Sequence, residues 1–177
     1  MRNTLRRVRG GLLTLREATR ADCPFINLVR NHYSTRIKLH DQNRYSLKET
    51  YEWFDLASPF WLIIEDDQVP VGYVRTSRDL GESIWVGVSI HVCQRRKGYA
   101  EWAYRQVIQW LIAADYKSAY LEVSTKNHPA LQLYRKLGFK IVSTKTTDDA
   151  DRQFFVMRLR LSEFRNLTLL QTKQPAV

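Results

Sequence analysis

The segment Arg95-Arg96-Lys97-Gly98-Tyr99-Ala100 decides how the rest of this chain is interpreted. An apolar, strand-like run over 83–92 precedes it, and a helix-like segment extends from about Tyr99 to Ala114. A strand, a short basic turn with glycine and a helix form a cradle for phosphate, because the turn amides and the helix N-terminus both attract an anion. The segment is neither a P-loop nor a dinucleotide fingerprint, since the residues that define those motifs are missing. The pattern therefore predicts a phosphate-bearing cofactor or substrate.

Composition indicates one globular domain. The chain has 177 residues, of which 44% are hydrophobic, enough for a sizeable core. The longest unbroken apolar run, 60–64, is too short to span a bilayer, and no apolar stretch follows the N-terminal arginines as in a secretory signal. The two cysteines and four histidines show no metal-ligand spacing. We therefore expect a cytoplasmic protein with no metal site.

The formal net charge of +10 predicts an anionic partner, such as nucleic acid, a membrane surface or a phosphorylated small molecule. Part of this charge lies at the two ends of the chain. We expect a basic N-terminal arm over 1–10, the folded domain over 11–162 and a C-terminal tail over 163–177. Nucleic acid is the less favoured partner, because no helix-turn-helix, zinc-finger or aromatic RNA-binding motif accompanies the charge.

Periodicity and turn residues predict a mixed α/β (α+β) fold with a mostly antiparallel sheet flanked by helices. Thr19 with Asp22 and Ser46 with Glu49 resemble helix starts, Gly138 resembles a helix end, and the segment 32–45 looks irregular. The unit 83–124 would be a parallel strand–helix–strand crossover. The strands expected from the sequence cover 12–17, 61–65, 70–76, 83–92, 119–124, 140–144 and 153–161, and the helices cover about 19–31, 46–54, 99–114 and 127–137.

A second group of chemically capable residues follows the strand 119–124. Glu122 is on that strand, Asn127 begins the next helix and Tyr134 lies in that helix's second turn. We expect all three side chains to converge on one cleft.

The chain resembles the GNAT acetyltransferase superfamily in the combination of these two groups. Arg95-x-x-Gly98-x-Ala100 follows Val-Ser-Ile-His, and Leu-Glu-Val, Asn127 and Leu-Tyr-x-x-Leu-Gly-Phe come later at the family's spacing. The resemblance covers about 12–161 and is strongest over 88–139. The chain departs from the family pattern at Val92, where many members have proline, and at Ala100, a common substitute for glycine.

This resemblance implies acetyl-CoA as the acetyl donor, bound where two parallel strands splay apart. The amides of residues 96–101 would hold the pyrophosphate, and the backbone of 88–90 would pair with the pantetheine arm. An amide there could also polarise the thioester carbonyl. The cofactor-binding residues that the resemblance implies are Val88, Ser89, Ile90, Arg95, Arg96, Lys97, Gly98, Tyr99, Ala100, Glu101 and Asn127.

Acetyl transfer to an amine needs two proton movements. The amine must lose a proton before it attacks, and the departing thiolate benefits from a nearby acid. We assign the base to Glu122, as in family members that acetylate ribosomal-protein N-termini, and the acid to Tyr134, acting by direct transfer in a ternary complex. Structural roles remain open: a core position for Tyr134, an ion pair with an arginine for Glu122 and a helix cap for Asn127. His91 is a weaker candidate for the base.

The acceptor is less well specified. The segment 31–54 combines aromatic residues, which can stack on a nucleobase, with cationic residues, which can pair with phosphates. It is similar to the same segment of family members that acetylate nucleotide-linked amino sugars, as in pseudaminic-acid synthesis. An amino-sugar nucleotide is therefore the first expectation, and a small-molecule amine the general one. A protein N-terminal or lysine acetyltransferase is the second. A basic nucleic-acid-binding module with a vestigial acetyl-CoA site is the third, and a homodimer stays open.

Overall fold

Strand β5, Ser83–Ile90, contributes to both structural units of the chain. The first unit contains the residues up to 78 together with 86–104, and the second contains 79–85 and the residues from 105 onward. The computed structural model describes residues 3–8, 11–57, 61–77, 81–147 and 152–164.

The first unit contains an antiparallel sheet in which each strand pairs with the next one along the chain. Asp67 and Gln68 form the turn between β3 and β4, with φ of 50° and 67°, as a two-residue hairpin turn of type I′ requires. β1 lies within the segment expected as a basic arm, where it pairs with β2. The strands are β1 Asn3–Val8, β2 Gly11–Glu17, β3 Trp61–Asp66, β4 Val69–Thr76 and β5.

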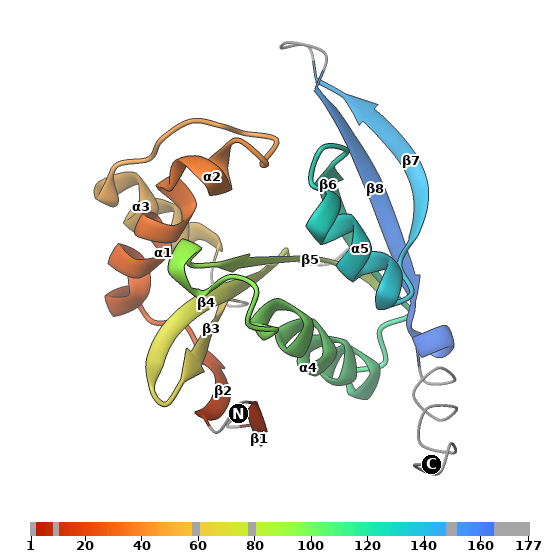
Figure 1. Ribbon diagram of the computed structural model, residues 1–177, viewed down its shortest axis with the longest axis horizontal. Helices are drawn as coiled ribbons and strands as arrows, with labels where there is room; N and C mark the ends of the chain where they lie inside the picture. Colours follow the sequence, from red (N-terminus) through yellow and green to blue (C-terminus); the bar gives the residue numbers. More distant parts are fainter. Residues whose placement is uncertain (1–2, 9–10, 58–60, 78–80, 148–151, 165–177) are drawn as a thin grey trace. The chain divides into compact units, whose positions relative to one another are not determined.

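Helix α1 packs against α2, α3 and strand β4 of this unit (Figure 1). The predicted helix start at Ser46 is confirmed: its N–H donates to Glu49 Oε2 (2.7 Å), and the Glu49 N–H donates to Ser46 Oγ (3.1 Å). The segment 32–45, expected to be irregular, contains α2, because the His32 side chain caps a turn there. The helices are the 3₁₀ turn η1 Arg20–Asp22, α1 Cys23–Asn31, α2 Tyr33–Arg36 and α3 Leu47–Ala57, and the core they share with the sheet contains Cys23, Ile26, Val29, Phe54, Trp61, Ile63 and Tyr73.

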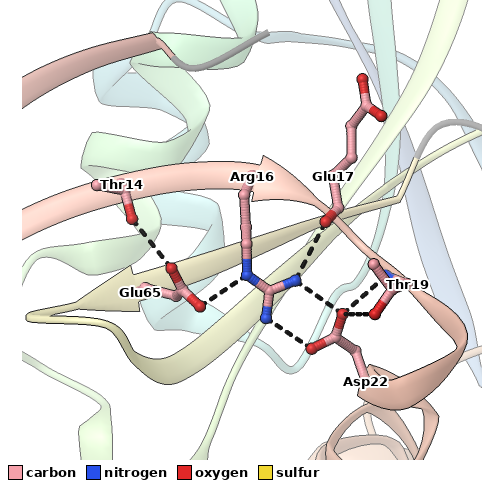
Figure 2. Close-up of polar contacts among 6 residues, drawn as sticks. All are labelled: Thr14, Arg16, Glu17, Thr19, Asp22 and Glu65. Carbon is pink, nitrogen blue, oxygen red and sulfur yellow. Dashed lines mark hydrogen bonds and ion pairs between the residues drawn. The ribbon is translucent and has the colours of Figure 1, made fainter.

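One arginine joins three elements of the first unit (Figure 2). Arg16 of β2 donates from Nε to Glu65 Oε1 on β3 (2.7 Å), and from Nη1 and Nη2 to both carboxylate oxygens of Asp22 in η1 (2.8 and 2.7 Å). The Thr19 N–H also donates to Asp22 Oδ2 (2.7 Å). Burial alone would raise the pKa of Asp22, but the hydrogen bonds from Arg16 and Thr19 lower it below its ordinary value. This cluster fixes the entry into α1 against the sheet.

The second unit contains the strand order β5-β6-β8-β7. β5 and β6 are parallel and pair over Ser83–Trp85 and Ser118–Tyr120, whereas β6–β8 and β7–β8 are antiparallel. With one parallel pair among antiparallel ones, the expected mixed, mostly antiparallel fold class is confirmed. The remaining strands are β6 Ser118–Ser124, β7 Lys140–Thr146 and β8 Gln153–Arg160.

Helix α5, His128–Lys136, ends in a Schellman motif. The Gly138 N–H donates to Arg135 O (3.0 Å) and the Phe139 N–H to Tyr134 O (2.9 Å), with Gly138 at φ 93°. The predicted stop at Gly138 is therefore confirmed. α4 covers Tyr99–Ala113, and no described helix is long and apolar enough to cross a membrane.

One strand boundary of the sequence-based expectation differs from the structure. The strand expected over 83–92 ends at Ile90, because the Gln94 N–H bonds to His91 O (2.8 Å) and closes the 3₁₀ turn η2, Val92–Gln94.

The substitution Asp22→Asn is expected to lower the free energy of unfolding by about 2 kcal/mol at pH 7, because it removes a buried, hydrogen-bonded carboxylate from Arg16. The folded-state pKa of Asp22 is depressed, so its contribution is complete above the unfolded pKa of about 3.9 and is lost as the pH falls through the folded value. Urea unfolding should therefore show a difference from wild type that shrinks below about pH 4.

Asp55→Asn is the matched control. Asp55 pairs with Arg20 through half-exposed side chains, so this change should affect unfolding much less. Equal losses in the two variants would contradict the role given to Asp22.

Candidate functional site

The backbone of β5 alternates between two sides. The His91 N–H donates to Val71 O on β4 (2.9 Å), and the register places Ile90 opposite Gly72. Because backbone groups alternate along a strand, residues 87, 89 and 91 direct theirs toward β4 and residues 86, 88 and 90 direct theirs away from it.

Side chains already donate hydrogen bonds to two of the three outward carbonyls. Tyr104 Oη donates to Val86 O (3.3 Å), and Arg95 Nε donates to Ile90 O (3.2 Å). Val88 lies between them, and the pairing of β5 with β6 ends at Trp85. An extended ligand could therefore pair with Val88 in place of a strand. Ser89, whose backbone is directed toward Tyr73 of β4, is less suited to such pairing.

The turn after η2 forms the predicted cradle. Arg96 and Gly98 have positive φ values of 66° and 89°. The Trp102 N–H donates to Gly98 O (3.0 Å), so Gly98 is the residue from which α4 begins. A Cβ on Gly98 would meet no heavy atom within 4 Å, which leaves space in front of the first turn of α4. A helix N-terminus beside such space binds anions through its amides.

Two of the predicted binding side chains support this turn from behind. Arg95 donates from Nη1 to Ser34 Oγ (2.8 Å) and from Nη2 to Thr35 Oγ1 (2.6 Å), which ties the turn to α2. Burial lowers the pKa of the Arg95 guanidinium. Tyr99 is buried, and its hydroxyl donates to Asp66 at the end of β3. These two side chains therefore hold the cradle in shape, and Ala100 and Glu101 follow in the first turn of α4.

Further cations surround the cradle. Lys38 is half-buried, and its pKa is lowered first by burial and then by the positive charges of Arg95 and Arg96. Arg96 itself is exposed, and Lys97 Nζ donates to Gln94 Oε1 (2.7 Å). The sequence analysis included Lys38 in the acceptor segment 31–54. Nothing in its spacing along the chain indicated a position near the turn. The structure places it beside the cradle.

In the second unit, Glu122 lies on β6 among aromatic and cationic side chains. Its Oε1 is 3.7 Å from Lys145 Nζ, and that buried oxygen has no hydrogen-bond partner among the described residues. Lys145 Nζ also lies 5.5 Å from the centroid of Trp85, whose ring is 5.5 Å from Tyr120. The ion pair considered from the sequence exists, with a lysine as the partner. Lys145 was not singled out from the sequence.

Asn127 and Tyr134 belong to the same unit. Asn127 occupies the N-cap position of α5, but its side chain makes no cap hydrogen bond. Asn127 therefore occupies the cap position considered from the sequence, but it does not cap the helix with its side chain. The side-chain amide stays available to a ligand. Tyr134 is buried with its ring centroid 6.0 Å from that of Phe139. The Schellman motif fixes the backbone of Tyr134 through its carbonyl.

The chain that carries the cradle and the residues Glu122, Asn127 and Tyr134 can be compared with known proteins. Residues 25–139 match the profile of the acetyltransferase (GNAT) family. This chain belongs to the GNAT family. Its members are acetyltransferases that use acetyl-CoA, so the predicted enzyme class and acetyl donor are confirmed. No curated protein sequence matches the chain significantly.

Solved structures show the same GNAT fold at low sequence identity. The spermidine N-acetyltransferase of Vibrio cholerae in complex with CoA and spermine is 20% identical, with a TM-score of 0.79, over 87% of this chain and 98% of that one. YncA of Salmonella typhimurium with acetyl-CoA is 18% identical, with a TM-score of 0.71, over 84% and 94%. The ribosomal-protein-alanine N-acetyltransferase of Brucella melitensis is 17% identical, with a TM-score of 0.72, over 82% and 98%.

The side chains described for this GNAT enzyme contain no group of three or more His, Cys, Asp or Glu residues that could hold a metal ion. The polar groups at the two parts of the candidate site are cations, amides, one carboxylate and one phenol. Such groups can bind phosphates and move protons.

Two substitutions in the cradle are expected to change stability in opposite directions. Gly98→Ala should lower the free energy of unfolding by about 1–2 kcal/mol, since an L-residue is strained at this φ although space is available. Arg96→Gly should raise it by roughly 0.5 kcal/mol, because relief of the same strain exceeds the entropy gained by the unfolded chain. Denaturant unfolding measures both changes. Equal signs would show that the turn differs from the one described.

Proposed function

We propose that this GNAT enzyme acetylates the primary amine of a nucleotide-linked amino sugar. The observation that supports it is the charge on the sheet face of the second unit that carries Glu122. Residues directly opposite in the strand register share a face, so Glu122 and Tyr120 share one with Arg158, which β8 places opposite Tyr120. The cations of this face are Lys140, Lys145, Arg158 and Arg160, and aromatic surface comes from Trp85 and Tyr120.

This charge argues against a polyamine acceptor. One similar structure is a spermidine N-acetyltransferase that contains spermine, and a polycation needs carboxylates to bind. Four cations here outnumber the two described carboxylates beside them: Glu122, which pairs with Lys145, and Glu163, which pairs with Lys140 and Arg160. A nucleotide-linked sugar instead brings phosphates for the cations and a base for the aromatic rings.

Acetyl-CoA supplies an activated acetyl group as a thioester. The amides of 96–101 would hold its pyrophosphate, with Lys38 and Arg96 adding positive charge. Val88 and Ile90 would pair with the pantetheine arm, and the Asn127 amide would contact it. Three observations fit this assignment. Space is open at Gly98, Val88 lies between two carbonyls that already accept hydrogen bonds, and the Asn127 side chain makes no cap hydrogen bond.

The two proton movements are assigned to Glu122 and Tyr134. Glu122 Oε1 takes a proton from the acceptor amine, directly or through water, because this buried oxygen has no hydrogen-bond donor of its own. Tyr134 Oη gives a proton to the sulfur of the departing CoA thiolate as the C–S bond breaks, so CoA leaves as a neutral thiol. Lys145 holds Glu122 in place until the amine arrives.

A protein N-terminal acetyltransferase is the second candidate, favoured by a strand carboxylate in the setting Leu121-Glu122-Val123. Release of free CoA can be measured with three acceptors: a UDP-linked amino sugar, an N-terminal peptide and spermidine. We expect turnover with the amino sugar. Turnover with the peptide alone would establish the second candidate, and turnover with spermidine alone would contradict the charge argument.

Tyr134→Phe should lower kcat by about a hundredfold or more while the affinity for acetyl-CoA changes little, because the ring and its packing on Phe139 are kept and only the acid is lost. Steady-state kinetics with calorimetry separate the two effects. Tyr116→Phe removes a hydroxyl elsewhere in the same unit and is the control. An unchanged kcat in Tyr134→Phe would exclude the acid role.

Glu122→Gln should also lower kcat by about a hundredfold, because the neutral amide cannot accept the amine proton. Raising the pH should partly restore turnover in this variant, since more of the amine is then already neutral. A variant with wild-type kcat at neutral pH would assign the base to another group.

A further inference from the structure

Three cations and one carboxylate line a hollow in the second unit. Its volume is about 230 Å³, and the residues around it are Lys140, Arg158, Arg160 and Glu163. Clefts for drug-sized ligands span roughly 300–1,000 Å³. The hollow therefore suits one small charged group of a larger molecule, or a small ion.

The strand register explains why the cations gather. Lys140 of β7 lies directly opposite Arg158 of β8, and Arg160 follows two positions along the same strand. All three side chains therefore leave one face of the sheet. Like charges directly opposite each other destabilise an antiparallel pair. The arrangement costs stability unless an anion offsets it.

Glu163 offsets only part of this charge. Its Oε2 lies 2.8 Å from Lys140 Nζ, and its Oε1 lies 3.9 Å from Arg160 Nη1. Arg158 is half-buried and forms no hydrogen bond or ion pair within bonding distance of another described residue. A guanidinium that has lost part of its water needs an acceptor, and the phosphoryl group matches its planar set of donors.

The hollow lies on the same sheet face as Glu122. Arg158 is opposite Tyr120 of β6, and Tyr120 is two residues from Glu122. Two residues of a strand span about 7 Å. One small ligand can therefore reach the hollow with a phosphoryl group and Glu122 with an amine.

We infer that Lys140, Arg158 and Arg160 bind a phosphoryl group of the acceptor whose amine reaches Glu122. The inference rests on the proposed function for the identity of the acceptor. Glu163 holds Lys140 while the site is empty, and the phosphoryl group takes the place of its carboxylate. Arg158 supplies the donors that no protein group uses.

Calorimetric titration of inorganic pyrophosphate into the full chain saturated with CoA tests the anion site, because CoA occupies the cradle. Arg158→Gln should weaken binding about tenfold, as loss of a charge-assisted contact implies. Arg135→Gln makes the same change at an exposed position of α5 and should leave the affinity within about twofold. Equal affinities in both variants, or no binding to wild type, would overturn the inference.

Glu163→Gln provides a test that misfolding cannot imitate. It removes the carboxylate that competes for Lys140 and Arg160, so pyrophosphate should bind several times more tightly than to wild type. Weaker or unchanged binding would show that Glu163 does not compete with an anion and would contradict the inference.

Kinetics with a UDP-linked amino sugar then identify the source of the phosphoryl group. Arg158→Gln should raise the KM for this acceptor about tenfold with little change in kcat. An unchanged KM, together with weakened pyrophosphate binding, would overturn the acceptor assignment and leave a site for a free anion. A third outcome is that the variants change pyrophosphate binding but the enzyme acetylates no nucleotide-linked sugar. That result would contradict the proposed function and support the anion site.

Discussion

Strand β5 changes its partner partway along its length. Its first three residues pair with β6, and its residues from Val86 onward pair with β4. A backbone group that faces no neighbouring strand needs another partner, in the protein or in water, and the pairing of β5 with β6 ends at Trp85. Tyr104 and Arg95 supply such a partner at the two flanking carbonyls. Between them, the backbone of Val88 is extended and has no described strand beside it on this side. The cradle begins a few residues further along the chain.

The sequence predicted the features that depend on neighbouring residues. The helix start at Ser46 and the helix end at Gly138 are each determined by a few neighbouring positions. The strand, basic turn and helix around Gly98 predicted the cradle, and the family resemblance implied the role of Tyr134. Contacts between distant segments could not be read in this way. The ion pair of Glu122 with Lys145, the burial of Lys38 near the cradle and the support of the turn by Arg95 all depend on tertiary packing.

The positive charge of the chain is not confined to its ends. It is concentrated around the cradle in the first unit, at Lys38, Arg95 and Arg96, and around the hollow in the second, at Lys140, Arg158 and Arg160. Each group contains at least one half-buried cation, Lys38 and Arg95 in the first and Arg158 in the second, beside exposed ones. Part of the net charge of +10 therefore lies in two groups of cations within the folded units.

Arg95 connects α2 to the turn that leads into α4. Its guanidinium is hydrogen-bonded to Ser34 and Thr35 of α2, and its Nε to Ile90 at the end of β5. Any molecule that stiffens α2 therefore also stiffens the turn leading into α4. Linkage is reciprocal: if a molecule bound at α2 strengthens binding at the turn, occupation of the turn strengthens binding at α2 by the same factor. Hydroxyl groups at positions 34 and 35 would then govern how strongly one bound molecule favours the other, although neither hydroxyl takes part in the chemistry.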